Sequence, residues 1–412
     1  MRVAACTVKQ ITRVSTPGKR ALNIESLRKK GWFAVHLVLL AGLAVPAGAQ
    51  GSDLIAALPG TQQLQPGQLL TARTSSQNAL PDASENILIS YISTSFDGKN
   101  TVVFGQVSIP RTPVPAGGYP VVSFASGTTG FAPQCAPSLT QGYANGYLNE
   151  WLKRGYAVVR TDYEGWGAAS PRPIMHGKSN ANGIVDIVAA AHSLRDKLSN
   201  DWIVLGHSEG GGAALWTAGR PGTTEGKYRL RGAIAVSPTG PGVLKFMNNA
   251  LNGGYVYQGT QAYISVTVLA AQVVDPSIDL PDLVAKPMMP QVQAAKTACL
   301  AELTALPQLH RGEYLKPGTA YDKFIEFLLA QDASSLTMGV PVLIVQGEAD
   351  NGPVSVDTTE QLIASLCSHN ASIDYRKYRG EGHGSVLGAS KDDAFSFAAA
   401  VFAGHAPTNS CR

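Results

Sequence analysis

A serine between glycines, at the end of an apolar run, is the part of this sequence with the clearest chemical meaning. Residues 201–216 read DWIVLGHSEGGGAALW, and the apolar run stops at the pentapeptide GHSEG of residues 206–210. When a strand turns sharply into a helix around a serine, the positions two before and two after it must lack bulk, and both are glycine here. Such a turn holds the hydroxyl beside the free N–H groups of the next helix. We predict that Ser208 is a nucleophile for carbonyl groups; a glycine-rich turn that binds an anion, or nothing, is the alternative.

A carboxylate is expected downstream, because a serine hydroxyl is a weak nucleophile and needs a histidine base that a carboxylate orients. On this type of turn, the acid and then the histidine follow the serine in the chain. The apolar run PVLIVQG of residues 341–347 leads to Asp350, which lies just past the end of a predicted strand. We predict Asp350 as the acid, with Glu348 and Asp357 as substitutes; a simple turn aspartate is the alternative.

The base is expected to be His383, which follows the last predicted strand within the segment GEGHG of residues 380–384. Glycines on both sides allow a loop to bring the imidazole to the strand ends, where it must lie to reach Ser208. His207 adjoins the serine and is predicted to support the site. No grouping of His, Asp and Glu in the sequence has convincing metal-ligand spacing, so we predict no metal and no cofactor. Four further histidines are expected to be surface or structural residues: His176, His192, His310 and His369.

Two backbone N–H donors for an oxyanion are expected near the serine, because a tetrahedral intermediate needs N–H groups aimed at its negative oxygen. One is predicted to be the backbone N–H of Glu209, directly after the nucleophile. The other is predicted in the segment SGTTG of residues 126–130, whose glycines let the backbone approach closely. Thr128 or Gly127 is our prediction there, and a flexible glycine loop without this role is the alternative.

Strands and helices alternate along most of the chain, after an opening antiparallel hairpin. This order implies an α/β architecture, with a mostly parallel sheet and helices on both faces. Between 237 and 339 the alternation fails, so we expect a core of residues 87–239 and 340–412 and an inserted cap, residues 240–339, over the strand ends. The expected strands are 87–94, 101–109, 119–125, 156–161, 202–205, 231–236, 341–345 and 373–378, and the expected helices are 147–154, 184–198, 211–217, 361–366 and 392–402.

The first 49 residues are predicted to be a signal peptide. Basic residues at 28–30 precede an apolar run over 32–45, and small residues follow at 47–49. A membrane anchor is the alternative, although about 14 apolar residues fall short of the roughly 20 that span a bilayer. Residues 50–86 are expected to be an extended lead-in. The predicted signal peptide indicates a secreted or periplasmic protein. Without the first 49 residues the chain has 25 bases against 28 acids, so we expect no nucleic-acid partner.

Four cysteines remain after the signal peptide: Cys135, Cys299, Cys367 and Cys411. An even number in an exported chain indicates two disulfides, for which three pairings exist. The short separation of Cys367 and Cys411 favours a bond between them, which leaves Cys135 to pair with Cys299. No two of these cysteines have metal-ligand spacing.

The chain resembles the secretory lipases of the fungal lipase A type and their exported bacterial relatives, within the α/β-hydrolase superfamily. The likeness covers roughly residues 87–412. It implies the α/β-hydrolase fold with a helical cap between the sixth and seventh strands, a triad of Ser208, Asp350 and His383, and disulfides Cys135–Cys299 and Cys367–Cys411. The segments that carry it are GTTG at 127–130, CAPS at 135–138, WL at 151–152, RGYAVV at 154–159, TDYEG at 161–165 and residues 206–212.

From these patterns we expect a serine hydrolase of carboxylic esters, a lipase or esterase, and the resemblance implies lipid-like acyl chains. An acyltransferase, a peptidase or a polyester hydrolase would use the same residues, and a non-catalytic binding protein on this scaffold is a further alternative. Glu209 departs from the resemblance, because relatives often carry Gln or Gly after the serine, and the cap matches least well. A small-molecule or lipid ester is the expected substrate. Transient contact with a lipid surface, acyl-chain preference and oligomeric state stay open.

Overall fold

The computed structural model of the protein describes residues 64–140, 142, 144–166, 172–195, 197–352 and 354–411. The predicted signal peptide and residues 50–63 of the lead-in lie outside the described residues. Among the described residues, no helix combines the length and apolar character needed to cross a membrane.

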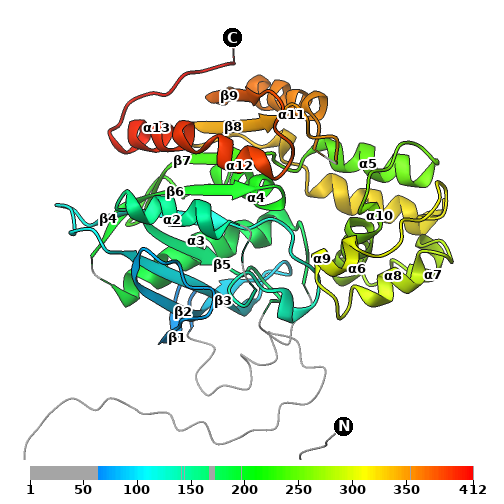
Figure 1. Ribbon diagram of the computed structural model, residues 1–412, viewed down its shortest axis with the longest axis horizontal. Coiled ribbons are helices and arrows are strands. Elements are labelled where there is room, and N and C mark those ends of the chain that lie inside the picture. Colours follow the sequence, from blue (N-terminus) through cyan, green and yellow to red (C-terminus); the bar gives the residue numbers. More distant parts are fainter. Residues whose placement is uncertain are drawn as a thin grey trace, which may run out of the picture. The chain divides into compact units, whose positions relative to one another are not determined.

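A nine-stranded sheet forms the centre of the fold, in the order β1-β2-β3-β5-β4-β6-β7-β8-β9 (Figure 1). Strands β1, β2 and β3 are antiparallel to their neighbours, and all pairs from β5 to β9 are parallel. The predicted mostly parallel sheet is therefore confirmed. The strands are β1 (Leu69–Thr74), β2 (Ala83–Thr94), β3 (Asn100–Pro110), β4 (Tyr119–Ala125), β5 (Ala157–Thr161), β6 (Leu198–His207), β7 (Arg229–Val236), β8 (Val342–Gly347) and β9 (Ile373–Tyr378).

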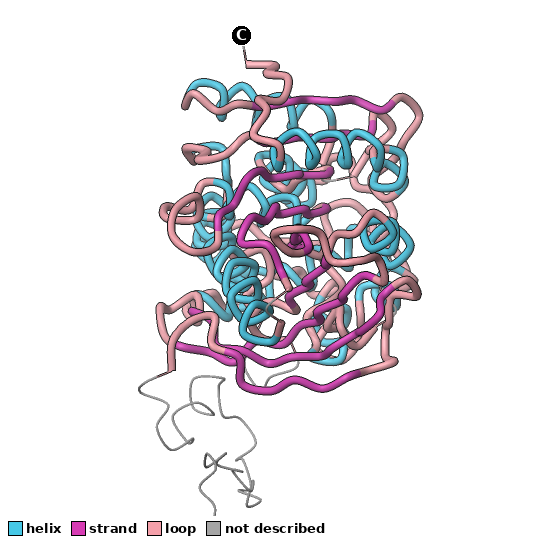
Figure 2. Tube along the Cα trace, turned by 90° about the vertical axis from the view of Figure 1, so that its left-hand side faces the viewer, coloured by secondary structure: helices cyan, strands magenta, loops and turns pink. Residues whose placement is uncertain are grey.

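Helices cover both faces of this sheet, as the tube in Figure 2 shows from the edge. Successive side chains of a strand point to opposite faces, so Val121 and Val204 join one apolar cluster, and Val122 and Leu205 join another. The first cluster includes side chains of α3 (Gly177–Leu194), α4 (Glu209–Ala218) and α11 (Val356–Ser368), and the second those of α2 (Asn145–Lys153), α12 (Ser385–Ala389) and α13 (Lys391–Phe402).

The chain between β7 and β8 contains the helices of the segment that we predicted as the cap, and they lie beyond one end of the sheet in Figure 1. Their apolar side chains form a cluster of their own, with Phe324, Leu283 and Ile264 fully buried in it. The helices are α5 (Pro241–Leu251), α6 (Thr260–Val274), α7 (Leu280–Leu283), α8 (Met289–Ala294), α9 (Leu300–Thr304) and α10 (Thr319–Ala330), followed by the 3-10 turn η3 (Ala333–Ser335).

The expected start of regular structure was wrong. Regular structure begins before residue 87: β1 pairs with β2, which itself starts at Ala83. Strand β1 has the sequence LLTART and mostly exposed side chains, so it lacks the apolar alternation that reveals a strand. With β1 included in the count, the predicted sixth and seventh strands are β7 and β8, and the inserted helices lie between them.

Helix α3 begins at Gly177, seven residues before the predicted start at 184. Its first turns are polar in sequence, and the side chains of Ser179, Asn180 and Asn182 are buried there, each with a hydrogen-bond partner. The Ser179 hydroxyl donates to Glu164 Oε2 at 2.5 Å, and Asn182 Nδ2 donates to the Thr94 carbonyl at 2.9 Å. Buried polar residues of this kind do not produce the apolar period by which a helix is predicted.

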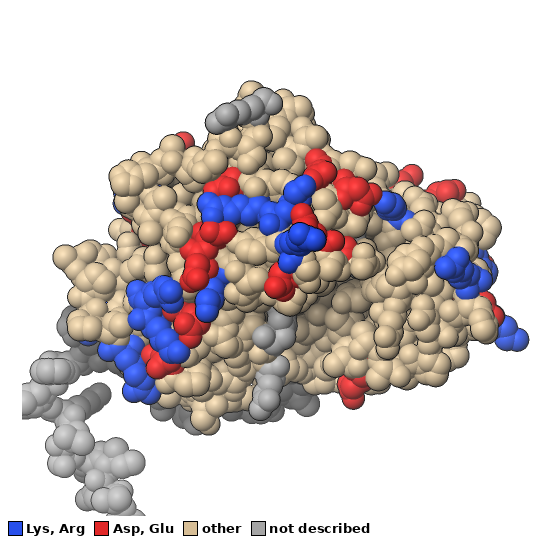
Figure 3. Space-filling view, turned by 45° about the horizontal axis from the view of Figure 1, so that its top comes forward, with Lys and Arg blue, Asp and Glu red and all other residues tan. Residues whose placement is uncertain are grey.

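Basic and acidic side chains are interspersed on the face of the molecule that Figure 3 shows. Several ion pairs join different elements: Lys377 of β9 lies 3.0 Å from Glu360 of α11, and Arg154, which follows α2, lies 3.8 Å from Asp392 of α13. These pairs are partly exposed, and each is expected to contribute about 0–1 kcal/mol to stability.

Candidate active site

Ser208 lies on a sharp turn between β6 and α4, with φ 59° and ψ −120°. A positive φ is unusual for a residue other than glycine, and the crowding around the turn explains how it is maintained. A Cβ atom on Gly206 would lie 1.9 Å from the Gly210 carbonyl oxygen, and one on Gly210 would lie 1.9 Å from the Ala125 carbonyl oxygen. Both positions therefore require glycine, as the sequence pattern predicts.

Three side chains from distant parts of the chain form a line of hydrogen bonds at the carboxyl ends of the strands. His383 Nε2 lies 2.9 Å from Ser208 Oγ, and His383 Nδ1 lies 2.7 Å from Asp350 Oδ2. Because an ionised carboxylate only accepts hydrogen bonds, Nδ1 carries the proton, and Nε2 is left to accept the proton of the serine hydroxyl. The Asp350 side chain is fully buried and that of His383 is 26% exposed. This geometry suits a base that must meet a substrate.

The loops after β8 and β9 approach each other closely, which brings Asp350 to His383. A Cβ atom on Gly347 would lie 2.3 Å from the Glu381 carbonyl oxygen, so this position needs glycine. The same carbonyl accepts a hydrogen bond from Ala349 N–H at 2.9 Å. Gly347 is not among the predicted site residues, although its place at the end of an apolar strand is a usable signal in the sequence.

Asp350 has further hydrogen bonds that hold its carboxylate. Gly352 N–H donates to Oδ1 at 3.1 Å, and Gln346 Nε2 lies 3.5 Å from Oδ2. The two substitute acids lie elsewhere: Glu348 is exposed, and Asp357 pairs with Lys245 Nζ at 2.6 Å. Of the three carboxylates considered, the structure therefore brings Asp350 to the histidine.

His207 lies behind the histidine base. It is 5% exposed, its Nε2–H donates to the His383 carbonyl oxygen at 2.7 Å, and the centroids of the two imidazole rings are 4.8 Å apart. Burial, together with a smaller effect of the positive charge that His383 carries when protonated, lowers the pKa of His207 to about 3. His207 is therefore neutral at physiological pH, and its contact fits the supporting role that we expected.

We predict that His207→Gln destabilises the protein most above pH 6.5, and that the difference from the wild type shrinks at lower pH. Between about pH 3 and 6.5 the unfolded chain binds a proton at His207 that the folded protein does not bind. The wild type therefore loses about 1.4 kcal/mol from this site for each pH unit. Urea unfolding at pH 8 and pH 5, with the exposed His405→Gln as control, measures this. A difference between wild type and variant that does not change with pH would contradict the prediction.

The predicted oxyanion donors lie on two segments that touch. Thr128 follows β4, and its hydroxyl donates to Glu209 Oε2 at 2.8 Å. Glu209 is the first residue of α4, so its N–H has no partner one turn back in the helix. Gly127 lies next to Thr128 in the same loop. Thr128 and Glu209 thus lie side by side, next to the serine.

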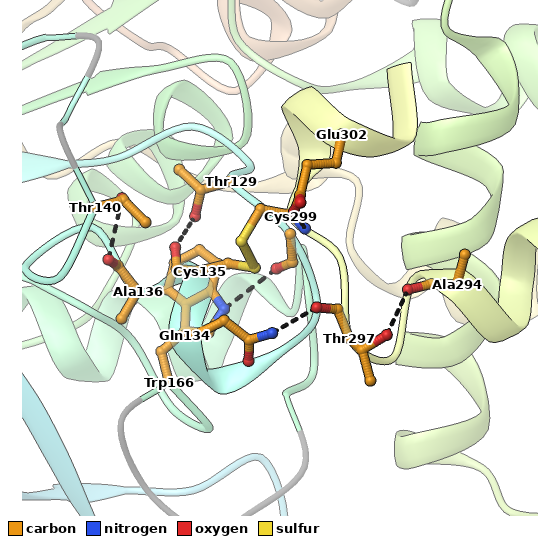
Figure 4. The surroundings of a disulfide bond; sticks show 11 residues. Thr129, Gln134, Cys135, Ala136, Thr140, Trp166, Ala294, Thr297, Cys299 and Glu302 are labelled. Atoms are coloured by element: carbon orange, nitrogen blue, oxygen red, sulfur yellow. Dashed lines mark hydrogen bonds between the residues drawn. A yellow bond between two sulfur atoms is a disulfide. The ribbon is translucent and has the colours of Figure 1, made fainter. Parts of the chain in front are cut away.

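A disulfide attaches the loop after β4 to helix α9 (Figure 4). Cys135 is bonded to Cys299, and Leu300 N–H donates to the Thr129 carbonyl at 2.8 Å. The Thr129 hydroxyl in turn donates to the Cys135 carbonyl at 2.6 Å. A second disulfide, Cys367–Cys411, connects α11 to the C-terminal tail. These are the two bonds that the resemblance implies.

A cavity of about 340 Å³ lies between this loop and α9. Its lining includes Thr128 and Thr129 of this loop and Leu300 and Ala301 of α9. Ser208 and His383 are not among the lining residues. The volume falls within the range of about 300–1,000 Å³ that is usual for small-molecule sites. No group of His, Cys, Asp and Glu side chains among the described residues could hold a metal ion.

A mostly parallel sheet with a serine on a strand-to-helix turn defines an α/β hydrolase. Residues 140–383, more than half of the chain, match the model of a family described as serine aminopeptidase, S33. The chain belongs to this family of hydrolases, and the predicted α/β-hydrolase fold is confirmed. We found no match among curated proteins by sequence.

Solved structures share this fold at low sequence identity. The rice cell wall degrading esterase LipA from Xanthomonas oryzae is 19% identical over 81% of this chain and 99% of its own, with a TM-score of 0.66. Candida antarctica lipase A in its closed state is 19% identical over 88% of this chain and 89% of its own, with a TM-score of 0.69. A putative hydrolase from Legionella pneumophila is 18% identical over 84% and 94%, with a TM-score of 0.65. At such identities the likeness concerns the fold.

Proposed function

We propose that the protein is a secreted serine hydrolase that cleaves carboxylic esters through an acyl-enzyme on Ser208. The observation that carries this proposal is the line of hydrogen bonds from Asp350 through His383 to Ser208, at 2.7 and 2.9 Å, on a strained turn at the strand ends. Such a line makes a serine hydroxyl nucleophilic at neutral pH.

In the first half of the reaction, Ser208 Oγ forms a bond to the ester carbonyl carbon while its proton moves to His383 Nε2. The resulting oxyanion is held by backbone N–H groups of Glu209 and of Thr128 or Gly127. His383 then gives the proton to the departing alcohol oxygen as the C–O bond breaks. In the second half, His383 takes a proton from water, the hydroxide attacks the acyl carbon, and the proton returns to Ser208 Oγ as the acid leaves. Asp350 keeps Nδ1 protonated throughout.

The apolar cavity beside Thr128 supports an ester with a hydrocarbon chain as the substrate. Each methylene that enters such a cavity contributes about 0.8 kcal/mol, or roughly a fourfold increase in kcat/KM, until the space is filled. Export is supported by the predicted signal peptide and by two disulfides, which persist in oxidising compartments.

The proposal predicts that the mature protein hydrolyses p-nitrophenyl esters, with kcat/KM rising from acetate through butyrate to octanoate. Two isomers, ethyl octanoate and octyl acetate, show whether the cavity takes the acyl or the alcohol chain. Ala301→Phe, on the α9 side of the cavity, should slow the preferred isomer and leave ethyl acetate unchanged; Ala403→Phe, at the exposed end of α13, is the matched control. No hydrolysis of any of these esters by the folded protein would refute the proposal.

A peptidase is the second candidate, because the family that the chain belongs to is described as serine aminopeptidase. The same acyl-enzyme would then form from an amide, with an amine as the leaving group. Comparing leucine p-nitroanilide with p-nitrophenyl butyrate under the same conditions separates the two activities. We expect kcat/KM for the ester to exceed that for the anilide, and the reverse order would favour the peptidase.

A further inference from the structure

A buried carboxylate lies next to the serine: the side chain of Glu209, which is 1% exposed. Three donors meet its Oε1 atom: Arg172 Nη2 at 2.7 Å, the Met175 backbone N–H at 2.9 Å and Asn180 Nδ2 at 3.0 Å. The Thr128 hydroxyl donates to its Oε2 atom at 2.8 Å. Such a set of donors on one side chain fixes its position, since losing any of them leaves a buried polar group less satisfied.

The charge of this carboxylate is balanced inside the protein. The Arg172 side chain is fully buried, and its guanidinium group lies 3.7 Å from the centroid of the Trp166 ring. A buried ion pair of this kind contributes little net stability compared with apolar residues, so its presence calls for another reason. Glu209 directly follows Ser208 in the chain, and this position indicates that the pair has a part in the reaction.

We propose that Glu209 is a positioning residue that holds the two sides of the oxyanion site together, and that Arg172 cancels its charge. This inference rests on the proposed function. Glu209 supplies one expected oxyanion donor from its own backbone, and its side chain holds Thr128, the residue expected to supply the other. One residue thus sets the separation of the two donors. Since such donors act only at the correct distance from the oxyanion, this separation controls kcat.

Arg172 has a separate part in this arrangement. An uncompensated carboxylate beside a forming oxyanion would repel it, and the repulsion is strong where water is excluded. With Arg172 paired to Glu209, the pair carries no net charge, and the N–H donors act on the oxyanion without opposition. The resemblance to secretory lipases implies Gln or Gly after the serine, and the pairing with Arg172 explains how a carboxylate is tolerated at that position.

Thr128→Val tests the positional link, by which we mean that the hydrogen bond from the Thr128 hydroxyl to Glu209 sets the separation of the two oxyanion donors. The substitution removes this hydrogen bond and leaves both backbone N–H groups in place. We expect kcat for p-nitrophenyl butyrate to fall about 10- to 100-fold with KM within threefold, and the Ki of a trifluoromethyl ketone to rise by a similar factor. Thr128→Ser, which restores the hydroxyl, should recover most of the activity. Ser93→Ala is the matched control, because Ser93 also donates to a buried carboxylate, Asp186 Oδ2 at 2.7 Å, away from the serine.

The control should lose thermal stability as Thr128→Val does and keep its kcat. If Thr128→Val keeps both kcat and Ki within twofold of the wild type, the positional link is refuted. A wild-type protein that hydrolyses no ester and reacts with no fluorophosphonate would instead refute the proposed function.

A double-mutant cycle tests the charge balance. Arg172→Gln leaves the Glu209 carboxylate without its ion-pair partner, so we expect a loss in kcat of about 100-fold or more. Adding Glu209→Gln removes the unpaired charge, and the double variant should be more active than Arg172→Gln alone. If the fold-losses in kcat of the two single variants, Arg172→Gln and Glu209→Gln, simply multiply in the double variant, the ion pair has no electrostatic part in the reaction. If Arg172→Gln does not fold, Thr128→Val still decides the link between Thr128 and Glu209.

Discussion

Ser208→Ala is expected to lower kcat for p-nitrophenyl butyrate by about 10⁶-fold, the size of effect found when a serine nucleophile is removed from a triad. The variant loses the Oγ atom that lies 2.9 Å from His383 Nε2. Alanine tolerates the turn at φ 59° as serine does, so we expect thermal unfolding to change little. Initial rates measured against a mock purification give the residual activity.

Ser193→Ala is the control for this change, because Ser193 is exposed on α3. It should keep the wild-type rate. A Ser208→Ala protein that retains more than a few per cent of the activity would exclude Ser208 as the nucleophile, and the reaction would then need another residue or an activated water.

Asp350→Asn is expected to have the second largest effect, a fall in kcat of about 10⁴-fold. The asparagine amide would donate to His383 Nδ1, which would then carry no proton. The other ring nitrogen, Nε2, would be protonated and unable to accept the proton of Ser208. Stopped assays over hours, with the enzyme at micromolar concentration, are sensitive enough to measure the remaining rate.

Asp357→Asn is the matched control, since Asp357 follows the same strand but pairs with Lys245 on the surface. Its kcat should equal that of the wild type. If Asp350→Asn is nearly as active as the wild type while Asp357→Asn is impaired, the acid has been assigned wrongly.

Much of the fold is predictable from the sequence because parallel strands buried on both faces are continuous apolar runs. Strand β4 has the predicted bounds of 119 and 125, and β9 those of 373 and 378. Edge strands and helical turns made of polar residues are the elements that the sequence pattern does not predict. Strand β1 is mostly exposed, and the first turns of α3 bury Ser179 and Asn180 through hydrogen bonds with side chains far away in the chain.

In the candidate site, too, local sequence patterns predict some residues, whereas other contacts depend on how distant segments pack. Ser208 and His383 are marked by glycines, and Asp350 by the apolar strand before it, so local patterns single out the three residues that the structure brings together. Arg172, Asn180 and Thr128 reach Glu209 from three separate segments. No local pattern in the sequence reports such a contact, because it depends on how α3 and the loop after β4 pack around α4.

Covalent labelling is the most direct measurement of a nucleophilic Ser208. The mature protein is incubated with a fluorophosphonate, and its intact mass and peptide masses are determined. We predict a single adduct per chain, on the peptide that contains Ser208, with loss of all esterase activity at the same rate as labelling. A folded protein that stays unlabelled, or that carries its adduct on another residue, would contradict an acyl-enzyme at this serine.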